Sequence, residues 1–384
     1  MSYPVSKAPG EQPVRLRLSF RGLTAIIGLK EPCAEVNIMT ARTSRYTSAI
    51  IVLVCAGTSL VRAQQGSIAG PLSGFAFDNS TRVLRPIRGI PGASLLGDPI
   101  PFGFDLVSAS VSPSLDSVLA VGAVNAPSDK GGMHLFRLNN GTPVERTVEG
   151  LAVAQRVVFS PSGTAAVLYA NGSLQVLKGL PDAPVIAATI PLGPGRTAQF
   201  SPAVLSRPKR GTRRLTDEPL AISDDGGYLL VVSGGAIRVI GTAGDNRKLM
   251  DAAAGAWAAF APGNHDAAVL DAAAGLVLFS DVAGASIERV LAGPDSRLAS
   301  PVGVAFSPDG QKLFVAGAGA RAVAAFDIAS GGRTIVACDC IPTGLVQMGG
   351  LFRLNEIGAE PLWLLDARTG EPRMIFVPAR GPDL

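Results

Sequence analysis

One hairpin pattern recurs along this chain of 384 residues and limits what the chain can fold into. Its clearest copy is VAFSPDGQKLFVAG at residues 304–317, which predicts a strand, a tight turn and a second strand. The copies align on the last apolar residue before the turn, which is Val111, Phe159, Ile222, Phe260 and Phe306. These positions are 48, 63, 38 and 46 residues apart, and self-similarity at that period predicts stacked or radial repeats.

Each repeat contains two further short strands after the hairpin. AVAAFDIASGG at residues 322–332 and PLWLLDARTG at 361–370 are typical third strands, and IERVLAG at 287–293 is a typical fourth. Four antiparallel strands in about 46 residues make a propeller blade. We therefore predict an all-β fold, a beta-propeller of seven four-stranded blades, with six or eight left open.

The composition agrees with this fold. The chain has 45 Gly, 29 Pro and few aromatic residues, which indicates many turns, and no segment has the pattern of a long amphipathic helix. Small side chains suit inner strands that crowd around a central axis, while one large apolar residue per repeat fills the space between blades. The hairpin recurs because one blade cannot bury both faces of its sheet alone.

The two ends of the repeated region suggest how the ring closes. Residues 74–92 resemble the third and fourth strands of a repeat whose first two strands are missing on the N-terminal side. We expect strands from residues 351–377 to complete this split blade, because a shared closing sheet removes open strand edges.

A secretory signal occupies residues 39–63. Arg42 and Arg45 precede an apolar run at 49–60, and Val61 and Ala63 are small enough for the two recognition positions before a cleavage site. The run is too short for a comfortable membrane span, so we expect cleavage near Ala63 and a single propeller domain at residues 64–384. A lipoprotein with Cys55 at the cleavage site is disfavoured, because the preceding Val54 is branched.

Residues 1–38 show no pattern that continues into the signal. Translation from Met39, with a mis-assigned upstream extension, explains them most simply, and a disordered or amphipathic leader is the alternative. Residues 1–63 carry eight basic and three acidic side chains, so their removal changes the net charge from +4 to about −1. A globally basic nucleic-acid binder is therefore not expected.

The order FSPDG, apolar strand, FDIASG within residues 305–331 resembles the YVTN-type and WD-repeat-like beta-propellers of bacterial exported proteins. The resemblance covers residues 74–378 with decreasing clarity, and it implies the fold more than a function, because such propellers include binding scaffolds, surface proteins and a few lactonase-like enzymes. Neither Trp257 nor Trp363 precedes an Asp, and a chain with two histidines cannot repeat the histidine network of WD repeats.

Few residues are suited to catalysis or metal binding. His134 lies in a predicted strand and His265 in a predicted turn, where structural roles are expected. DDGG at residues 224–227 has the acidic character of a calcium loop, but it occupies the same turn as SPDG and lacks spaced carboxylate ligands. We predict no catalytic, cofactor-binding or metal-binding residues and no cofactor.

The longest interval between repeats contains a basic insertion at about residues 201–219. Its charged members are Arg207, Lys209, Arg210, Arg213 and Arg214. The insertion is either a loop that contacts an anionic glycan, lipid surface or acidic protein, or a solvated mobile loop.

Cys338 and Cys340 are the cysteines that remain after signal cleavage. The Cα atoms of two residues that are two positions apart in a strand are separated by nearly the largest distance that a disulfide can span. A bridge therefore needs a local bend, which the following Pro342 and Gly344 can supply. Export favours oxidation, and a local disulfide and unbridged thiols both stay open. A metal or catalytic pair lacks further ligands.

Taken together, these features predict a secreted or periplasmic, non-enzymatic propeller, expected to be monomeric, that binds a protein, peptide or glycan. No nucleic-acid partner and no membrane span in the mature chain are expected. The alternative is a hydrolase or lactonase whose site lies at a mouth of the central channel. Converging acidic, arginine or histidine side chains around a pocket would favour the enzyme, whereas an Ala-, Gly- and Val-lined channel would favour the scaffold.

Overall fold

The computed structural model of the protein describes residues 70–123, 131–192, 220–252, 255–294 and 300–379, together with the backbone of two N-terminal strands. The chain divides into two compact units, at residues 1–67 and 68–384. In the first unit, β1 (Arg15–Phe20) and β2 (Leu23–Gly28) form an antiparallel hairpin. The predicted signal segment and cleavage position lie outside the described residues.

The second unit consists of seven antiparallel sheets, called blades 1 to 7 here in chain order. Blade 1 contains β3 (Leu72–Asp78), β4 (Val83–Arg88) and β5 (Leu95–Leu96); blade 2 contains β6 (Leu106–Val111), β7 (Ser117–Gly122), β8 (Gly132–Asn139) and β9 (Thr142–Arg146). Blade 3 contains β10 (Arg156–Phe159), β11 (Ala165–Ala170), β12 (Ser173–Lys178) and β13 (Val185–Pro191); blade 4 contains β14 (Leu220–Ile222), β15 (Tyr228–Val232), β16 (Ala236–Gly241) and β17 (Asn246–Asp251). Blade 5 contains β18 (Trp257–Phe260), β19 (Ala267–Asp271), β20 (Gly275–Ser280) and β21 (Ile287–Ala292); blade 6 contains β22 (Pro301–Phe306), β23 (Lys312–Gly317), β24 (Ala322–Asp327) and β25 (Arg333–Ala337). Blade 7 contains β26 (Val346–Met348), β27 (Leu351–Arg353), β28 (Leu362–Asp366) and β29 (Arg373–Val377).

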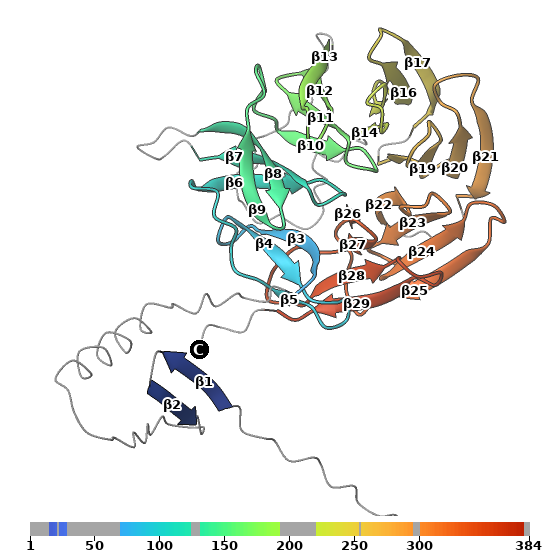
Figure 1. Cartoon of the computed structure of the whole chain (residues 1–384). Coiled ribbons are helices and arrows are strands. Elements are labelled where there is room, and N and C mark those ends of the chain that lie inside the picture. The colour runs from blue at the N-terminus through green and yellow to red at the C-terminus, as the bar shows by residue number, and fades with distance from the viewer. Residues whose placement is uncertain are drawn as a thin grey trace, which may run out of the picture. The chain divides into compact units, whose positions relative to one another are not determined.

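The blades stand in a ring around a central axis, with the first strand of each blade innermost (Figure 1). The predicted seven-bladed beta-propeller is confirmed, and blade 1 differs from the other six in having three strands. Among the described residues, no helix is long and apolar enough to cross a membrane.

A buried serine explains why the hairpin turn recurs. In blade 6, Phe306 pairs with Leu313, and Ser307 begins the turn between β22 and β23 with only 3% of its surface exposed. The Ser307 Oγ accepts from the Lys312 amide at 2.9 Å and donates to Asp309 at 2.5 Å, while Gly310 adopts a φ of 69°. Ser112, Ser160 and Ser223 hold the same position in blades 2, 3 and 4, and each accepts from the amide five residues later.

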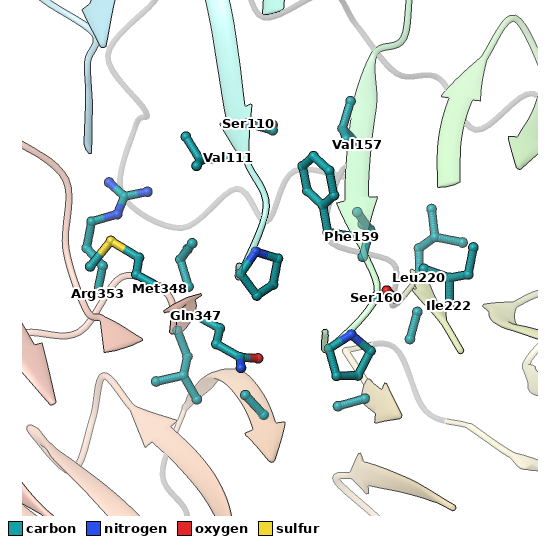
Figure 2. A pocket seen from close by; sticks show the side chains of 18 of the residues that line it. Ser110, Val111, Val157, Phe159, Ser160, Leu220, Ile222, Gln347, Met348 and Arg353 are labelled. Carbon is teal, nitrogen blue, oxygen red and sulfur yellow. The ribbon is translucent and has the colours of Figure 1, made fainter. Parts of the chain in front are cut away.

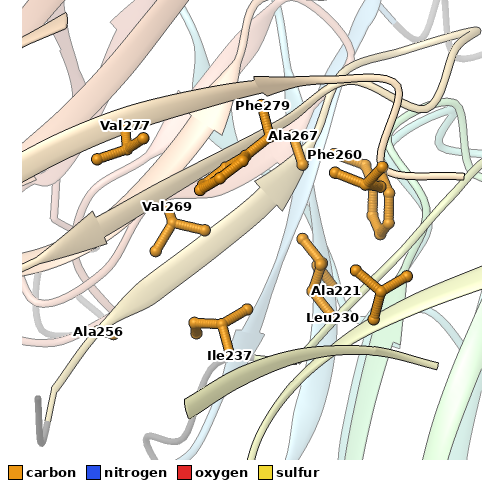
Figure 3. Close-up of a cluster of buried hydrophobic side chains, with 11 residues drawn as sticks. Ala221, Leu230, Ile237, Ala256, Phe260, Ala267, Val269, Val277 and Phe279 are labelled. Carbon is orange, nitrogen blue, oxygen red and sulfur yellow. The ribbon is translucent and has the colours of Figure 1, made fainter. Parts of the chain in front are cut away.

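Neighbouring blades pack through the large apolar residues that the repeat predicts. Between blades 4 and 5, Phe260 and Phe279 contact a cluster that includes Leu230 and Ile237 (Figure 3). Cations near the rim add contacts to the next blade: Arg247 donates to the carbonyl oxygens of Val282 and Gly284, and Arg289 to that of Ile328. Each sheet therefore covers a face of the next one, as a repeat that cannot bury both its faces requires.

The predicted split blade is wrong. β3 and β4 are the first two strands of blade 1, not the third and fourth of a shared sheet, and β26 to β29 form a complete sheet of their own. The ring closes by packing instead: Ala76 and Ile87 of blade 1 share a buried cluster with Met348, Leu351 and Leu364 of blade 7. Packing suffices because blade 7 supplies all four strands itself and leaves no gap for another segment to fill.

Candidate functional site: the central channel

A cavity of about 400 Å³ follows the propeller axis, and the inner strands of all seven blades line it (Figure 2). Five alanines contribute to the wall, which are Ala109, Ala221, Ala258, Ala259 and Ala305. Larger apolar side chains such as Val111, Phe159 and Met348 fill the remainder. The short side chains expected of the inner strands therefore leave room for a channel instead of a packed axis.

The lining has a few polar members and no acid. Arg156, Arg353, Gln347, Ser110 and Ser160 contribute polar groups, whereas no Asp, Glu or His of the described residues lines the cavity. General acid–base catalysis needs a titratable group within hydrogen-bonding reach of the reacting atoms. The described wall offers guanidinium, amide and hydroxyl groups, which suit binding better than proton transfer.

The two mouths of the channel differ in position and chemistry. The entry mouth is the end where the inner strands begin, near Val107, Arg156 and Val346. The exit mouth is the end where the inner strands enter the serine turns, after Val111, Phe159 and Phe306.

Arg353 lies at the entry mouth because it ends β27 and pairs there with Val346, the first residue of β26. Its Nη1 donates to the Glu356 carboxylate and, at 3.5 Å, to the Asn355 carbonyl oxygen. Only 11% of the Arg353 side chain is exposed, and its Nε is buried without a hydrogen-bond partner. Arg156 starts β10 in blade 3, so the two guanidinium groups come from opposite sides of the ring.

Aliphatic side chains remain exposed on the entry face. Val107 is 51% exposed, Val153 53%, Ile341 60% and Val346 42%. Val107 and Val346 belong to inner strands, while Val153 and Ile341 lie in the connections that lead into β10 and β26. Exposed aliphatic residues around one opening are the kind of surface that interaction sites present.

The exit mouth is held by contacts between turns of different blades, which we call the exit belt (residues 112–116, 160–164, 223–227, 261–266, 307–311 and 349). The Gly349 amide of blade 7 donates to Pro113 O of blade 2 at 2.6 Å. A side-chain carbon at Gly163 would lie 2.6 Å from Ser114 Oγ, and one at Gly310 would lie 3.6 Å from Pro262 Cγ. The turns are therefore close enough to support one another.

Asp224 joins three turns of the exit belt. Its Oδ1 accepts from the amide and the hydroxyl of Ser162 in blade 3, at 2.7 and 2.6 Å. Its Oδ2 accepts from the Gly263 amide in blade 5 at 2.8 Å. The DDGG turn thus has a structural role between blades. Among the described residues, no group of three or more His, Cys, Asp or Glu side chains is placed to hold a metal ion.

Neither histidine lines the channel. His134 lies on β8 with its Nδ1 2.7 Å from Glu145 Oε1, and its ring lies against Phe104. His265 belongs to the exit belt, where its Nε2 is 3.1 Å from Asp225 Oδ2 and its ring meets the edge of Tyr228.

Five aspartates of the described residues have a lowered pKa, and all lie in turns or at strand ends on the exit face. Burial raises the pKa of Asp78 and Asp225, but hydrogen bonds from Ser80 and Thr81 to the first, and from Ser223 to the second, outweigh it. The Ser307 hydroxyl lowers the pKa of Asp309, and the Ser330 amide lowers that of Asp327. Burial also opposes the lowered pKa of Asp366, which Arg368 and Arg373 produce.

Cys338 and Cys340 are joined in a disulfide with their Cα atoms 5.0 Å apart. Both are buried in the connection from blade 6 to blade 7, beside Phe314 and Phe352. The Arg321 carbonyl accepts from the Cys338 amide, which holds the bend. That the native protein carries this bond stays a prediction. The predicted basic insertion, with Arg207, Lys209, Arg210, Arg213 and Arg214, lies outside the described residues.

Sequence reasoning missed the channel arginines. Arg156 interrupts the apolar pattern directly before VVFSPSG, and this cation on an inner strand was the available signal. Arg353 lies on a second strand, and it reaches the channel where β26 and β27 are only three residues long.

Comparisons with two solved structures support the fold. No protein-family model matches the chain, and no curated protein matches it in sequence. A candidate 6-phosphogluconolactonase from Bacteroides fragilis is 18% identical, with a TM-score of 0.51, over 81% of this chain and 95% of that one. One from Bacteroides uniformis is 14% identical, with a TM-score of 0.50, over 80% and 96%. The periplasmic gluconolactonase of Pseudomonas aeruginosa is 15% identical, with a TM-score of 0.49, over 80% and 97%. The resemblance to YVTN-type and WD-repeat-like repeats stays a prediction.

Proposed function

We propose that this protein is an exported, non-enzymatic binding module that holds a protein or peptide partner against the entry face of its propeller. The observation that carries the proposal is the division of polar groups between the two mouths. Acids and hydroxyls of the exit belt form bonds within their own turns and, through Asp224, between blades, whereas the entry face presents Val107, Val153, Ile341 and Val346 to solvent. Aliphatic side chains around an opening favour an apolar segment of a polypeptide over a glycan.

Export is supported by the signal pattern at residues 39–63 and by a cysteine pair that can form a disulfide. A mature chain that begins near Gln64 would meet its partner in the periplasm or outside the cell.

The second candidate is a lactonase, which the likeness to two candidate 6-phosphogluconolactonases favours. Fold alone does not carry an activity, since one fold supports many functions. The lactonase would have to open its substrate without an acid or histidine among the described lining residues, so Arg156 and Arg353 would be left to polarise the carbonyl.

Two measurements separate the candidates. Purified protein is incubated with glucono-lactone and 6-phosphoglucono-lactone, and we expect ring opening no faster than in buffer. Crosslinking in the native periplasm or culture medium should capture a defined partner, and Ile341→Asp should reduce its yield at least fivefold. Ile287→Asp is the matched control, because Ile287 is 72% exposed on the outer strand β21, away from the entry mouth.

Lactone opening that Arg353→Gln abolishes would replace the binding proposal with the enzyme. Equal loss of capture in Ile341→Asp and Ile287→Asp would show that the entry face is not the docking surface.

A further inference from the structure

The geometry points to a second, smaller ligand: the channel behind the entry mouth binds an aliphatic carboxylate, with its carboxylate at Arg353 and its chain along the apolar wall. The inference goes beyond the proposed function, because it concerns the channel interior and not the surface that would hold a macromolecular partner.

The position of Arg353 fixes the orientation of such a ligand. Arg353 pairs with the first residue of β26, and Arg156 is the first residue of β10, so both lie at the entry end of the channel. Deeper positions belong to Val111, Phe159 and Met348, which Figure 2 shows around the cavity. A molecule that is anionic at one end and aliphatic at the other matches this order.

Arg353 is held in place before any ligand arrives. Glu356 and the Asn355 carbonyl both take hydrogen bonds from Nη1, which leaves Nη2 for an outside acceptor. The planar guanidinium group matches the two oxygens of a carboxylate better than an ammonium group does. Only 11% of this side chain is exposed, so the guanidinium group is largely shielded from water. Its attraction to a charged partner is therefore stronger than it would be at an exposed site.

The size and polarity of the cavity limit the rest of the ligand. The cavity volume of about 400 Å³ is at the small end of the range for ligand pockets. It accommodates a carboxylate with a chain of roughly six to ten carbons. A phosphorylated sugar would place several hydroxyl groups against Val111, Phe159 and alanine side chains, which offer them no hydrogen bonds. An aliphatic chain has no polar groups that would be left without hydrogen-bond partners.

The test measures decanoate binding to the full chain by isothermal titration calorimetry. We expect saturable binding of one decanoate per chain. Arg353→Gln should weaken it at least tenfold, and Arg353→Lys should weaken it less. Decanol, which lacks the charge, should bind more weakly than decanoate to the wild type and equally to the wild type and Arg353→Gln.

Two further variants keep the result interpretable. Val111→Trp places a bulky ring on the channel wall and should abolish decanoate binding, while Arg289→Gln removes a guanidinium on β21 that bonds Ile328 and should leave binding unchanged. Thermal melts of all variants identify any that fail to fold, and Arg353→Lys, which keeps the charge, replaces Arg353→Gln if that variant unfolds.

No saturable decanoate binding to the wild type at 1 mM would overturn the inference, as would binding that survives both Val111→Trp and Arg353→Gln. 6-Phosphogluconate is titrated in parallel. Its binding in place of decanoate would overturn the aliphatic ligand and would favour the lactonase. Partner capture that still depends on Ile341 would leave the proposed function standing in either case.

Discussion

The two mouths of the channel are made by the same repeat, yet they use their polar residues in opposite ways. At the exit mouth, Asp224 of blade 4 accepts hydrogen bonds from Ser162 of blade 3 and Gly263 of blade 5, and the Gly349 amide of blade 7 donates to Pro113 O of blade 2. At the entry mouth, two arginines line the cavity and aliphatic side chains face solvent. The difference teaches that the repeated motif encodes closure of the ring, while residues outside the motif are available for binding.

The comparison predicts where acid acts first. All five aspartates with a lowered pKa lie on the exit face, and a carboxylate with a lowered folded pKa stabilises the fold above its unfolded pKa of about 4. That contribution is lost as the pH falls through the folded values. We expect the melting temperature to fall steeply between pH 4 and pH 2, by more than any single substitution below produces. Differential scanning calorimetry at pH 7, 4 and 2.5 checks it, and a constant melting temperature would contradict the exit-face origin of acid sensitivity.

Asp78 should be the most sensitive single position at the exit face. It stands where blades 2, 3, 4 and 6 have the turn serine, and it forms a buried ion pair with Arg85 at 3.3 Å, with 8% of each side chain exposed. Asp78→Ala leaves a buried guanidinium unpaired, so the free energy of unfolding should fall by about 3–5 kcal/mol. Urea denaturation measures the loss. The double variant Asp78→Ala/Arg85→Leu should recover part of it, and no recovery would mean that the turn bonds to Ser80 and Thr81 matter more than the pair.

Asp224→Ala tests the exit belt itself. The substitution removes the acceptor for two Ser162 donors and the Gly263 amide, and because these groups lie near solvent the expected loss is about 1–2 kcal/mol. Asp251→Ala is the control, since Asp251 pairs with Lys248 on the surface and should cost less than about 0.5 kcal/mol. Equal losses in the two variants would show that the belt adds nothing to the stability of the ring.

The repeat made the fold predictable, and its eroded copies caused the error in the closure. Blade 1 has FDNSTR in place of the serine-proline turn, with Asp78 replacing the serine, so its first strand has the sequence pattern of a third strand. Blade 7 has Met348 and Gly349 where blade 6 has Phe306 and Ser307. Without the turn residues, nothing local distinguishes a first strand from a third.

The candidate site was less predictable because it depends on positions far apart in the chain. Asp224 bonds residues 62 positions before it and 39 after it, and only the ring brings them together. Arg353 and Arg156 come from blades 7 and 3, and no spacing rule connects them. Composition did anticipate the small side chains of the wall, because every inner strand faces the same crowded axis.

The smallest effect is expected at the entry face, and it sharpens the comparison most directly. Ile341 is 60% exposed and precedes β26 in the connection that contains the disulfide, so Ile341→Asp removes little buried surface and should change the free energy of unfolding by less than about 0.5 kcal/mol. Urea denaturation alongside Asp224→Ala makes the contrast within one experiment. A loss above 1 kcal/mol would show that Ile341 packs against the ring as the exit residues do, and the weaker partner capture expected of this variant would then report misfolding. An unchanged midpoint together with reduced capture would separate binding at the entry face from closure at the exit face.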